Sequence, residues 1–203
     1  MTPTRIRTRA AAQQRRAATE QAILDATESL LEIRSFRDLS VEDVMEVTGL
    51  GRTAFYRYFP DLERVVLRHM AGIAEDLHAA SREWFSADHP DAQLVDSGLR
   101  IAAVYRDHGR LMQAFSEASV AGPDVRDAWR DVLDSLIDPG VAHLELLIAQ
   151  GRAECAHPAE TIRALTVLID RYLLDIYGHA APVDVGVPVA VLVEIWRRSL
   201  RLS

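Results

Sequence analysis

Residues 40–66 read SVEDVMEVTGLGRTAFYRYFPDLERVV and place a glycine turn between two short helical patterns. The first pattern predicts a helix over 41–48, and Ser40 opens an S-x-x-D capping box at its start. Gly49 ends this helix, because glycine takes a positive φ without steric cost. We expect the next residue, Leu50, to enter the core.

The second pattern predicts a short helix over 52–58, with two faces of different chemistry. Phe55 and Phe59 form an apolar stripe that we expect to be buried. The opposite, polar face consists of Arg52, Thr53, Tyr56 and Arg57, and Tyr58 fits either face. A helix, a glycine turn and a short polar-faced helix form the plan of a helix-turn-helix, whose second helix reads DNA.

Charge is unevenly distributed along the chain, whose formal net charge is −7. Residues 1–70 carry 11 Arg against 10 Asp and Glu, whereas residues 71–203 carry 12 Arg against 20 acids. Every basic residue is Arg, and residues 1–19 hold five of them without an acid. A basic arm on an acidic body fits a small DNA-binding module, although a disordered basic tail without a partner has the same composition.

Other classes of protein find no support in the sequence. No apolar run reaches the roughly 20 residues of a membrane span, and the N-terminus lacks the apolar region of a secretory signal. Cys155 is the only cysteine, which is typical of a reducing cytoplasm. The histidines lack zinc-site spacing, and no phosphate-binding loop or nucleophile elbow occurs. We therefore expect no metal, cofactor, catalytic residue or membrane partner, and no enzyme activity.

The periodicity predicts an all-α fold. Expected helices lie near 20–34, 41–48, 52–58, 61–86, 91–107, 111–119, 123–150, 159–178 and 187–201. Gly109 is interpreted as a stop signal, and Pro139-Gly140 is expected to kink or split the seventh helix.

The same stretch resembles the DNA-binding segment of TetR/AcrR-family transcriptional regulators, over about residues 20–70. Further similarity points to the ethionamide-resistance regulator subgroup: ATESLLE, FYRYFP, Trp129, Asp170-Arg171 and EIW. The resemblance implies a homodimer with a three-helix DNA-binding domain and a helical ligand-binding and dimerisation domain. It gives a basic flexible arm over 1–19, a DNA-binding domain over 20–66 and a C-terminal domain over 67–203. The last two helices, near 159–178 and 187–201, would form the dimer interface.

Contacts with double-stranded operator DNA are expected from Ser40, Gly51, Arg52, Thr53, Tyr56, Arg57 and Tyr58. Two positions depart from the family pattern. Gly51 stands where members often have Ser, and Leu62 stands where they often have Lys. One phosphate contact is therefore expected to be missing, and the arginine-rich arm is a candidate replacement.

The candidate ligand pocket consists of Ile101, Tyr105, Phe115, Trp129, Leu133, Leu136, Thr166, Ile169, Asp170 and Leu173. Such a lining suits an elongated apolar molecule with one or two polar groups. From the residues alone, a plain helical core is the better reading; the family resemblance favours a pocket. Asp170 and Arg171 form either an internal or a surface pair.

Together these observations predict a cytoplasmic, ligand-responsive repressor that leaves a palindromic operator when a small apolar effector binds. The alternative is a helical small-molecule-binding protein or enzyme that retains a non-functional helix-turn-helix. An intact polar face on the second short helix argues against that alternative.

Overall fold

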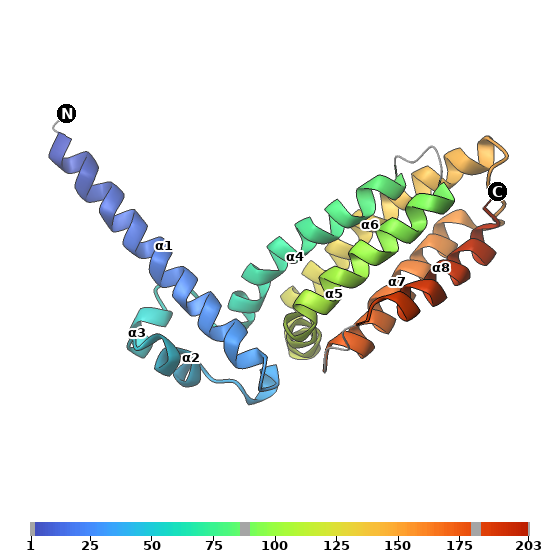
Figure 1. Cartoon of the computed structure of the whole chain (residues 1–203). Coiled ribbons are helices and arrows are strands. Elements are labelled where there is room, and N and C mark those ends of the chain that lie inside the picture. The colour runs from blue at the N-terminus through green and yellow to red at the C-terminus, as the bar shows by residue number, and fades with distance from the viewer. Residues whose placement is uncertain (1–2, 86–89, 180–183, 203) are drawn as a thin grey trace.

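The computed structural model describes residues 3–85, 90–179 and 184–202, and within these ranges the chain is helical, without a strand (Figure 1). The predicted all-α fold is confirmed. The elements are α1 (Pro3–Leu31), η1 (Phe36–Asp38), α2 (Val41–Thr48), α3 (Arg52–Phe55), α4 (Leu62–Phe85), α5 (Pro90–Ala121), α6 (Pro123–Ala149), α7 (Pro158–Tyr177) and α8 (Gly186–Leu200). No helix of the described residues is long and apolar enough to cross a membrane.

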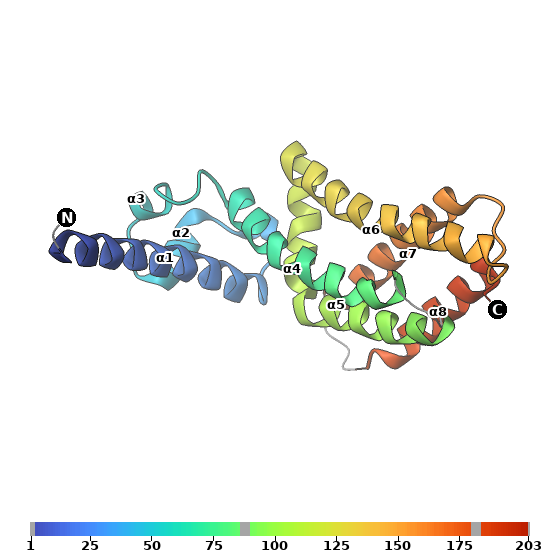
Figure 2. The ribbon, with the colours of Figure 1, turned by 90° about the horizontal axis from the view of Figure 1, so that it is seen from above.

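The N-terminal head contains α1, α2 and α3, and the remaining helices form a bundle (Figures 1 and 2). The capping box at the start of α2 is present, and Gly49 ends α2 with a φ of 68°. The stripe of α3 is buried as predicted, with Phe55 fully buried and Phe59 5% exposed. The expectation for Leu50 was wrong: its side chain follows the turn outward and is 40% exposed.

Helix α3 ends at Phe55, three residues before the predicted end. The chain continues as a turn in which the amides of Tyr58 and Phe59 both donate to the Phe55 carbonyl. Pro60 prevents any further continuation of the helix, because the residue before a proline, here Phe59, is driven out of the helical region.

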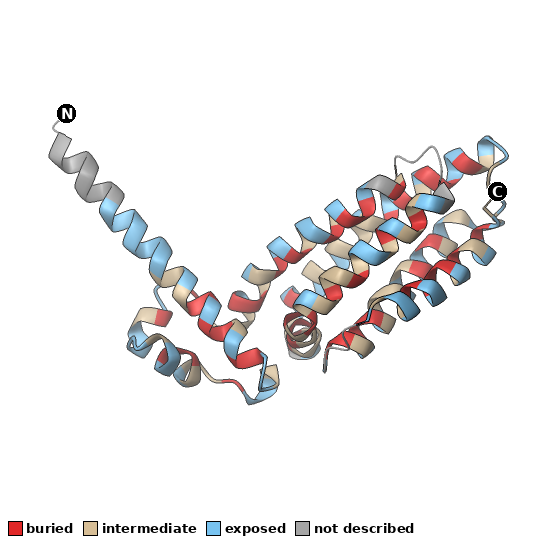
Figure 3. Cartoon of the chain, viewed as in Figure 1, coloured by how far each residue is buried: buried red, intermediate tan, exposed pale blue. Residues whose placement is uncertain are grey.

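Residues 3–19, expected as a flexible arm, instead extend α1 as continuous helix. Alanine, arginine and glutamine dominate this stretch, and all three have high helix propensity. Residues 11–18 are exposed and lie outside the packed head (Figure 3). The arm therefore projects arginines from a helix, and the guanidinium of Arg16 lies 5.9 Å from the ring centroid of Tyr58.

Helix α5 is one helix, whereas the sequence predicted two with a stop at Gly109. A Cβ at Gly109 would lie 2.2 Å from the carbonyl oxygen of Tyr177 in α7. The glycine thus permits a close crossing of two helix backbones, and the helix continues through it. The expected stop was wrong because glycine marks close approach as well as helix ends.

Helix α6 is also continuous through Pro139 and Gly140, so of the predicted kink or split, the split does not occur. Proline removes one backbone hydrogen bond. Buried side chains on both sides, including Ile137 and Leu144, hold the helix together across that position. A Cβ at Gly140 would lie 3.1 Å from Ile162, so this glycine too serves packing.

The predicted domain boundary after residue 66 falls within α4, which runs unbroken from the head into the bundle. On the head side, the ring of His69 shares a 3.2 Å hydrogen bond with the Leu24 carbonyl of α1. On the bundle side, α4 packs along α5. One rigid element therefore belongs to both parts.

The Gly109 crossing gives a stability prediction. Gly109→Ala should destabilise the fold by about 1–3 kcal/mol, because the new methyl group meets the Tyr177 backbone and cannot displace it cheaply. Chemical denaturation followed by circular dichroism measures the change.

Gly72→Ala is the matched control. Gly72 is an exposed glycine of α4, and no atom lies within 4 Å of a Cβ built there. This control should gain about 1 kcal/mol from helix propensity. Equal stability of Gly109→Ala and the natural protein would contradict the close crossing.

Candidate functional site

The exposed surface of α3 and of the turn that follows it presents the polar residues predicted from the sequence. Arg52, Thr53, Tyr56 and Arg57 are all exposed, and Tyr56 is 48% exposed although aromatic. Tyr58 is half-buried beneath Arg16. The buried stripe on the other side of α3 anchors this surface to the head, so the four side chains share one rigid platform. We call Arg52, Thr53, Tyr56 and Arg57 the reading face.

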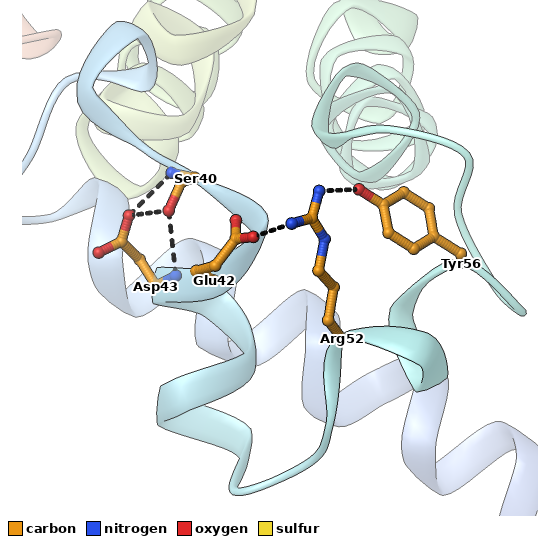
Figure 4. A network of polar contacts seen from close by, with 5 residues as sticks. All are labelled: Ser40, Glu42, Asp43, Arg52 and Tyr56. Atoms are coloured by element: carbon orange, nitrogen blue, oxygen red, sulfur yellow. Dashed lines mark hydrogen bonds and ion pairs between the residues drawn. The ribbon is translucent and has the colours of Figure 1, made fainter.

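Arg52 is held by two neighbours across the turn (Figure 4). One terminal nitrogen of its guanidinium contacts a carboxylate oxygen of Glu42 in α2, and the other donates to the Tyr56 hydroxyl at 3.0 Å. The guanidinium carbon also lies 5.6 Å from the centroid of the Tyr56 ring. These contacts raise the pKa of Arg52, with the hydrogen bond to Tyr56 as the main cause. The side chain is thereby ordered at the surface and remains charged.

Ser40 lies at the start of α2 and is engaged within the protein (Figure 4). Its hydroxyl accepts from the Asp43 amide at 3.2 Å, and its own amide donates to the Asp43 carboxylate at 2.9 Å. Arg34 adds a contact to the same carboxylate at 2.8 Å. Hydrogen bonds from Ser40, and then from Arg34, lower the pKa of Asp43. Ser40 therefore fixes α2 under the reading face.

Glu42 was missed as a participant by sequence reasoning. It is absent from the DNA-contact residues predicted from the sequence. Its contact with Arg52, ten positions along the chain, depends on the angle between α2 and α3. No periodic signal within either helix reports that angle.

A second feature is an apolar cavity of about 90 Å³ enclosed by α4, α5, α6, α7 and α8. Eight of the ten predicted pocket residues line it: Ile101, Tyr105, Leu133, Leu136, Thr166, Ile169, Asp170 and Leu173. The sequence analysis restricted the pocket to residues 91–178. It therefore missed the walls from α4 and α8: Leu77, Ser81, Trp84, Phe85, Leu192, Val193 and Trp196. Apolar residues on a second face of those helices were the available signal.

The two remaining predicted residues, Phe115 and Trp129, line a neighbouring cavity of about 120 Å³. Their ring centroids lie 5.6 Å apart. Asp170 contributes to the walls of both cavities. The predicted pocket residues are thus distributed over two adjoining spaces that meet at one carboxylate.

Asp170 is the only charged residue among the described walls of the 90 Å³ cavity. Its carboxylate accepts from the Tyr105 hydroxyl at 2.7 Å and from the Trp129 indole nitrogen at 3.5 Å. Burial raises the pKa of Asp170, and these two hydrogen bonds oppose the rise. Burial, followed by the charge of Asp170, places the pKa of Tyr105 well above its usual value. The neighbouring Arg171 is exposed, so the pair predicted from the sequence is divided between inside and outside.

No group of three or more potential metal-ligating side chains occurs in the part of the chain that the structure describes. Cys155 is half-buried, and its thiol donates to the Thr161 hydroxyl at 3.3 Å.

A helix-turn-helix head with an exposed basic reading face, joined through α4 to a helical body with an apolar cavity, defines a ligand-responsive DNA-binding transcriptional regulator. The family described as "Bacterial regulatory proteins, tetR family" matches residues 23–68, and "Transcriptional regulator EthR, C-terminal domain" matches residues 97–201. The chain belongs to the TetR family, with a C-terminal domain of the EthR type. It is a transcriptional regulator and not an enzyme.

Two relatives give the extent of the similarity. The chain is 28% identical over 189 residues to HTH-type transcriptional regulator EthR of Mycobacterium tuberculosis strain H37Rv, covering 89% of this chain and 86% of the relative. It is 25% identical over 185 residues to the EthR of Mycolicibacterium smegmatis, covering 89% and 85%.

Solved structures share the fold at lower identity. PfmR, a TetR-family regulator from Thermus thermophilus, has a TM-score of 0.70 at 17% identity, covering 87% of this chain and 97% of its own. Salmonella enterica GusR has a TM-score of 0.71 at 17% identity, covering 91% and 96%.

The contact between Glu42 and Arg52 gives a prediction for DNA binding. Glu42→Gln should increase affinity for a duplex selected by the natural protein from random DNA, because Arg52 loses a competing anion. Exposed ion pairs contribute about 0.2–1 kcal/mol, so the gain is about 1.4- to fivefold. Fluorescence anisotropy at fixed ionic strength measures it.

Glu46→Gln makes the same charge change at an exposed position of the same helix. It controls for the general effect of removing an acid near DNA. An equal gain from both variants would mean that the bond to Arg52 does not limit binding.

Proposed function

We propose that the chain is a repressor that acts in the cytoplasm, binds a palindromic operator as a homodimer and leaves it when a small apolar effector occupies the cavity. The carrying observation is the path of α4, which supports the head at one end and lines the cavity at the other. A molecule seated in the cavity therefore touches the same helix that positions the reading face.

Arg52 and Arg57 are the proposed base readers, because an arginine can form two hydrogen bonds with a guanine edge in the major groove. Thr53 and Tyr56 supply hydroxyl groups for phosphate oxygens. Gly51 and Tyr58 flank them, and Tyr58 lies beneath Arg16 of the helical arm. We assign Ser40 a supporting contact, since its hydroxyl already caps α2.

The proposed dimer interface consists of α7 and α8. Each helix carries exposed apolar side chains in addition to its buried ones: Val167 and Leu168 on α7, and Val187 and Val191 on α8. A helix that is apolar beyond one stripe is usually buried on two sides. Sedimentation equilibrium at micromolar concentration measures this assembly, and a stable monomer would contradict it.

The effector signal is proposed to travel through α4 and its contacts with the body. Arg64, in the first turns of α4, forms a 2.7 Å ion pair with Asp124 of α6. The Phe36 amide, in the head, donates to the Glu117 carboxylate of α5 at 2.9 Å. A ligand that shifts α4 changes the separation of the two reading faces of a dimer. It releases DNA only to the extent that it prefers the shifted conformer.

DNA reading is tested with the combined variant Arg52→Ala, Tyr56→Ala and Arg57→Ala. Each of the two base-reading arginines contributes about 1–3 kcal/mol, so we expect affinity for the selected duplex to fall by at least about thirtyfold. The salt dependence of the remaining affinity should also become weaker, because fewer phosphate counterions are released. Anisotropy titrations at several salt concentrations measure both quantities.

Arg130→Ala removes an exposed arginine of α6 and is the control for lost positive charge. Unchanged binding by the combined variant would refute the reading face.

The ligand switch is tested by filling the cavity. Leu133→Trp or Leu136→Trp should imitate a bound effector, weakening operator binding and blunting the response to any effector while the dimer persists. Operator affinity, sedimentation and thermal unfolding are measured on each variant.

Leu146→Trp makes the same substitution on an exposed position of α6 and should leave operator binding unchanged. A folded, dimeric Leu133→Trp protein with normal operator affinity would show that the cavity does not control the heads.

A further inference from the structure

Three buried hydrogen-bond donors without a protein acceptor line one end of the 90 Å³ cavity. They are the Trp84 indole nitrogen in α4, the Ser97 hydroxyl in α5 and the Trp196 indole nitrogen in α8. The residues are 3%, 3% and 7% exposed, and all three line the cavity. Buried polar atoms are usually hydrogen-bonded, so three orphans around one space indicate a partner that enters it.

Aromatic packing leaves at least one indole N–H without a partner. The Trp84 and Trp196 rings meet edge to face, with centroids 5.1 Å apart and planes at 89°. In such a pair only one ring can direct its edge N–H at the face of the other. Phe85 and His143 pack against Trp84 with centroids 5.6 and 5.0 Å away, so the ring is held in place.

The remaining walls select the charge of the entering group. Around the donors the lining is apolar, with Leu94, Leu192 and Val193 nearby on the same helices. The described lining contains no cationic side chain, and its one charged residue is Asp170. An anion there would be buried without a counter-ion, and Asp170 would repel it. A neutral acceptor oxygen satisfies the donors without that cost.

The two polar ends are well separated. Ser97 and Tyr105 are eight residues apart on α5, which corresponds to about 12 Å along the helix axis. Tyr105 and Asp170 satisfy each other at their end. A ligand with its acceptor at Ser97 can therefore lay an apolar chain toward Tyr105 along Ile101, Leu136 and Leu173.

We propose that the Trp84 indole, the Ser97 hydroxyl and the Trp196 indole form a subsite for the carbonyl oxygen of a neutral acyl compound, with its hydrocarbon chain extended toward Tyr105. This subsite gives the chemical class of the effector and rests on the proposed function only for its consequence at DNA. Whether the subsite exists can be tested by ligand binding in the absence of DNA.

The test compares isosteric probes on the full-length protein without DNA. 2-Nonanone carries the carbonyl, 2-methyl-1-nonene replaces its oxygen with a methylene group, and nonanoate carries a charged acceptor. Competition against a reporter dye bound in the cavity gives each dissociation constant. We expect the ketone to bind at least about tenfold more tightly than the alkene and more tightly than nonanoate.

Variants assign the preference to the donors. Ser97→Ala should reduce the ketone-to-alkene ratio several-fold, and adding Trp196→Phe should bring it close to one, with alkene affinity little changed. Ser81→Ala is the matched control, because this hydroxyl lines the same cavity but already donates to the Leu77 carbonyl. It should leave the ratio unchanged.

A ratio near one in the natural protein, an equal loss in Ser81→Ala, or tighter binding of nonanoate overturns the subsite. The first and third results need no variant, so a Trp196→Phe protein that fails to fold does not decide the test. Anisotropy with operator DNA separates the two proposals. A ketone that binds with the expected ratio but leaves DNA bound supports the subsite and counts against the ligand switch.

Discussion

The packing of α4 along α5 is the contact on which both halves of the molecule depend. Helix α4 buries Val65 and Val66 near its start and Leu77 and Trp84 toward its end, so one continuous apolar stripe passes from the head into the bundle. In the proposed switch, a displacement imposed at Trp84 would therefore act on the same helix that carries Val65 and Val66. A hydrogen bond from the Phe36 amide to the Glu117 carboxylate also joins the head to α5 at this junction.

The reading face shows how a small head keeps an exposed arginine ordered. Arg52 shares its guanidinium between Glu42 and Tyr56, so in the proposed complex the side chain would lose less conformational freedom on binding DNA. In that complex the DNA would also compete with the carboxylate of Glu42 for this guanidinium. The contact with Glu42 would thus order Arg52 but weaken its interaction with DNA. The buried side chains of Phe55 and Phe59 stabilise the surface from beneath.

Inside the bundle, the two ends of the 90 Å³ cavity differ in how their polar groups are satisfied. Asp170 is bonded to Tyr105 and Trp129, and that end links α5, α6 and α7. The donors of Trp84, Ser97 and Trp196 lack protein acceptors. Such an imbalance costs stability in the free protein and is recovered by a ligand with a matching acceptor. A ligand with one acceptor group would therefore bind in the cavity in a single orientation.

The sequence by itself determined features that depend on a few neighbouring residues. These include the capping box at Ser40, the positive φ of Gly49 and the buried stripe of Phe55 and Phe59. The pocket wall in residues 91–178 was expected only from the family resemblance, because the residues alone favoured a plain core. Tertiary structure decided the features in which distant segments meet. Gly109 is a crossing point and not a stop because Tyr177 lies against it, and Glu42 meets Arg52 because α2 and α3 cross at a particular angle. Periodicity reports which face of a helix is apolar, but the partner of that face is set by the packing of the whole chain.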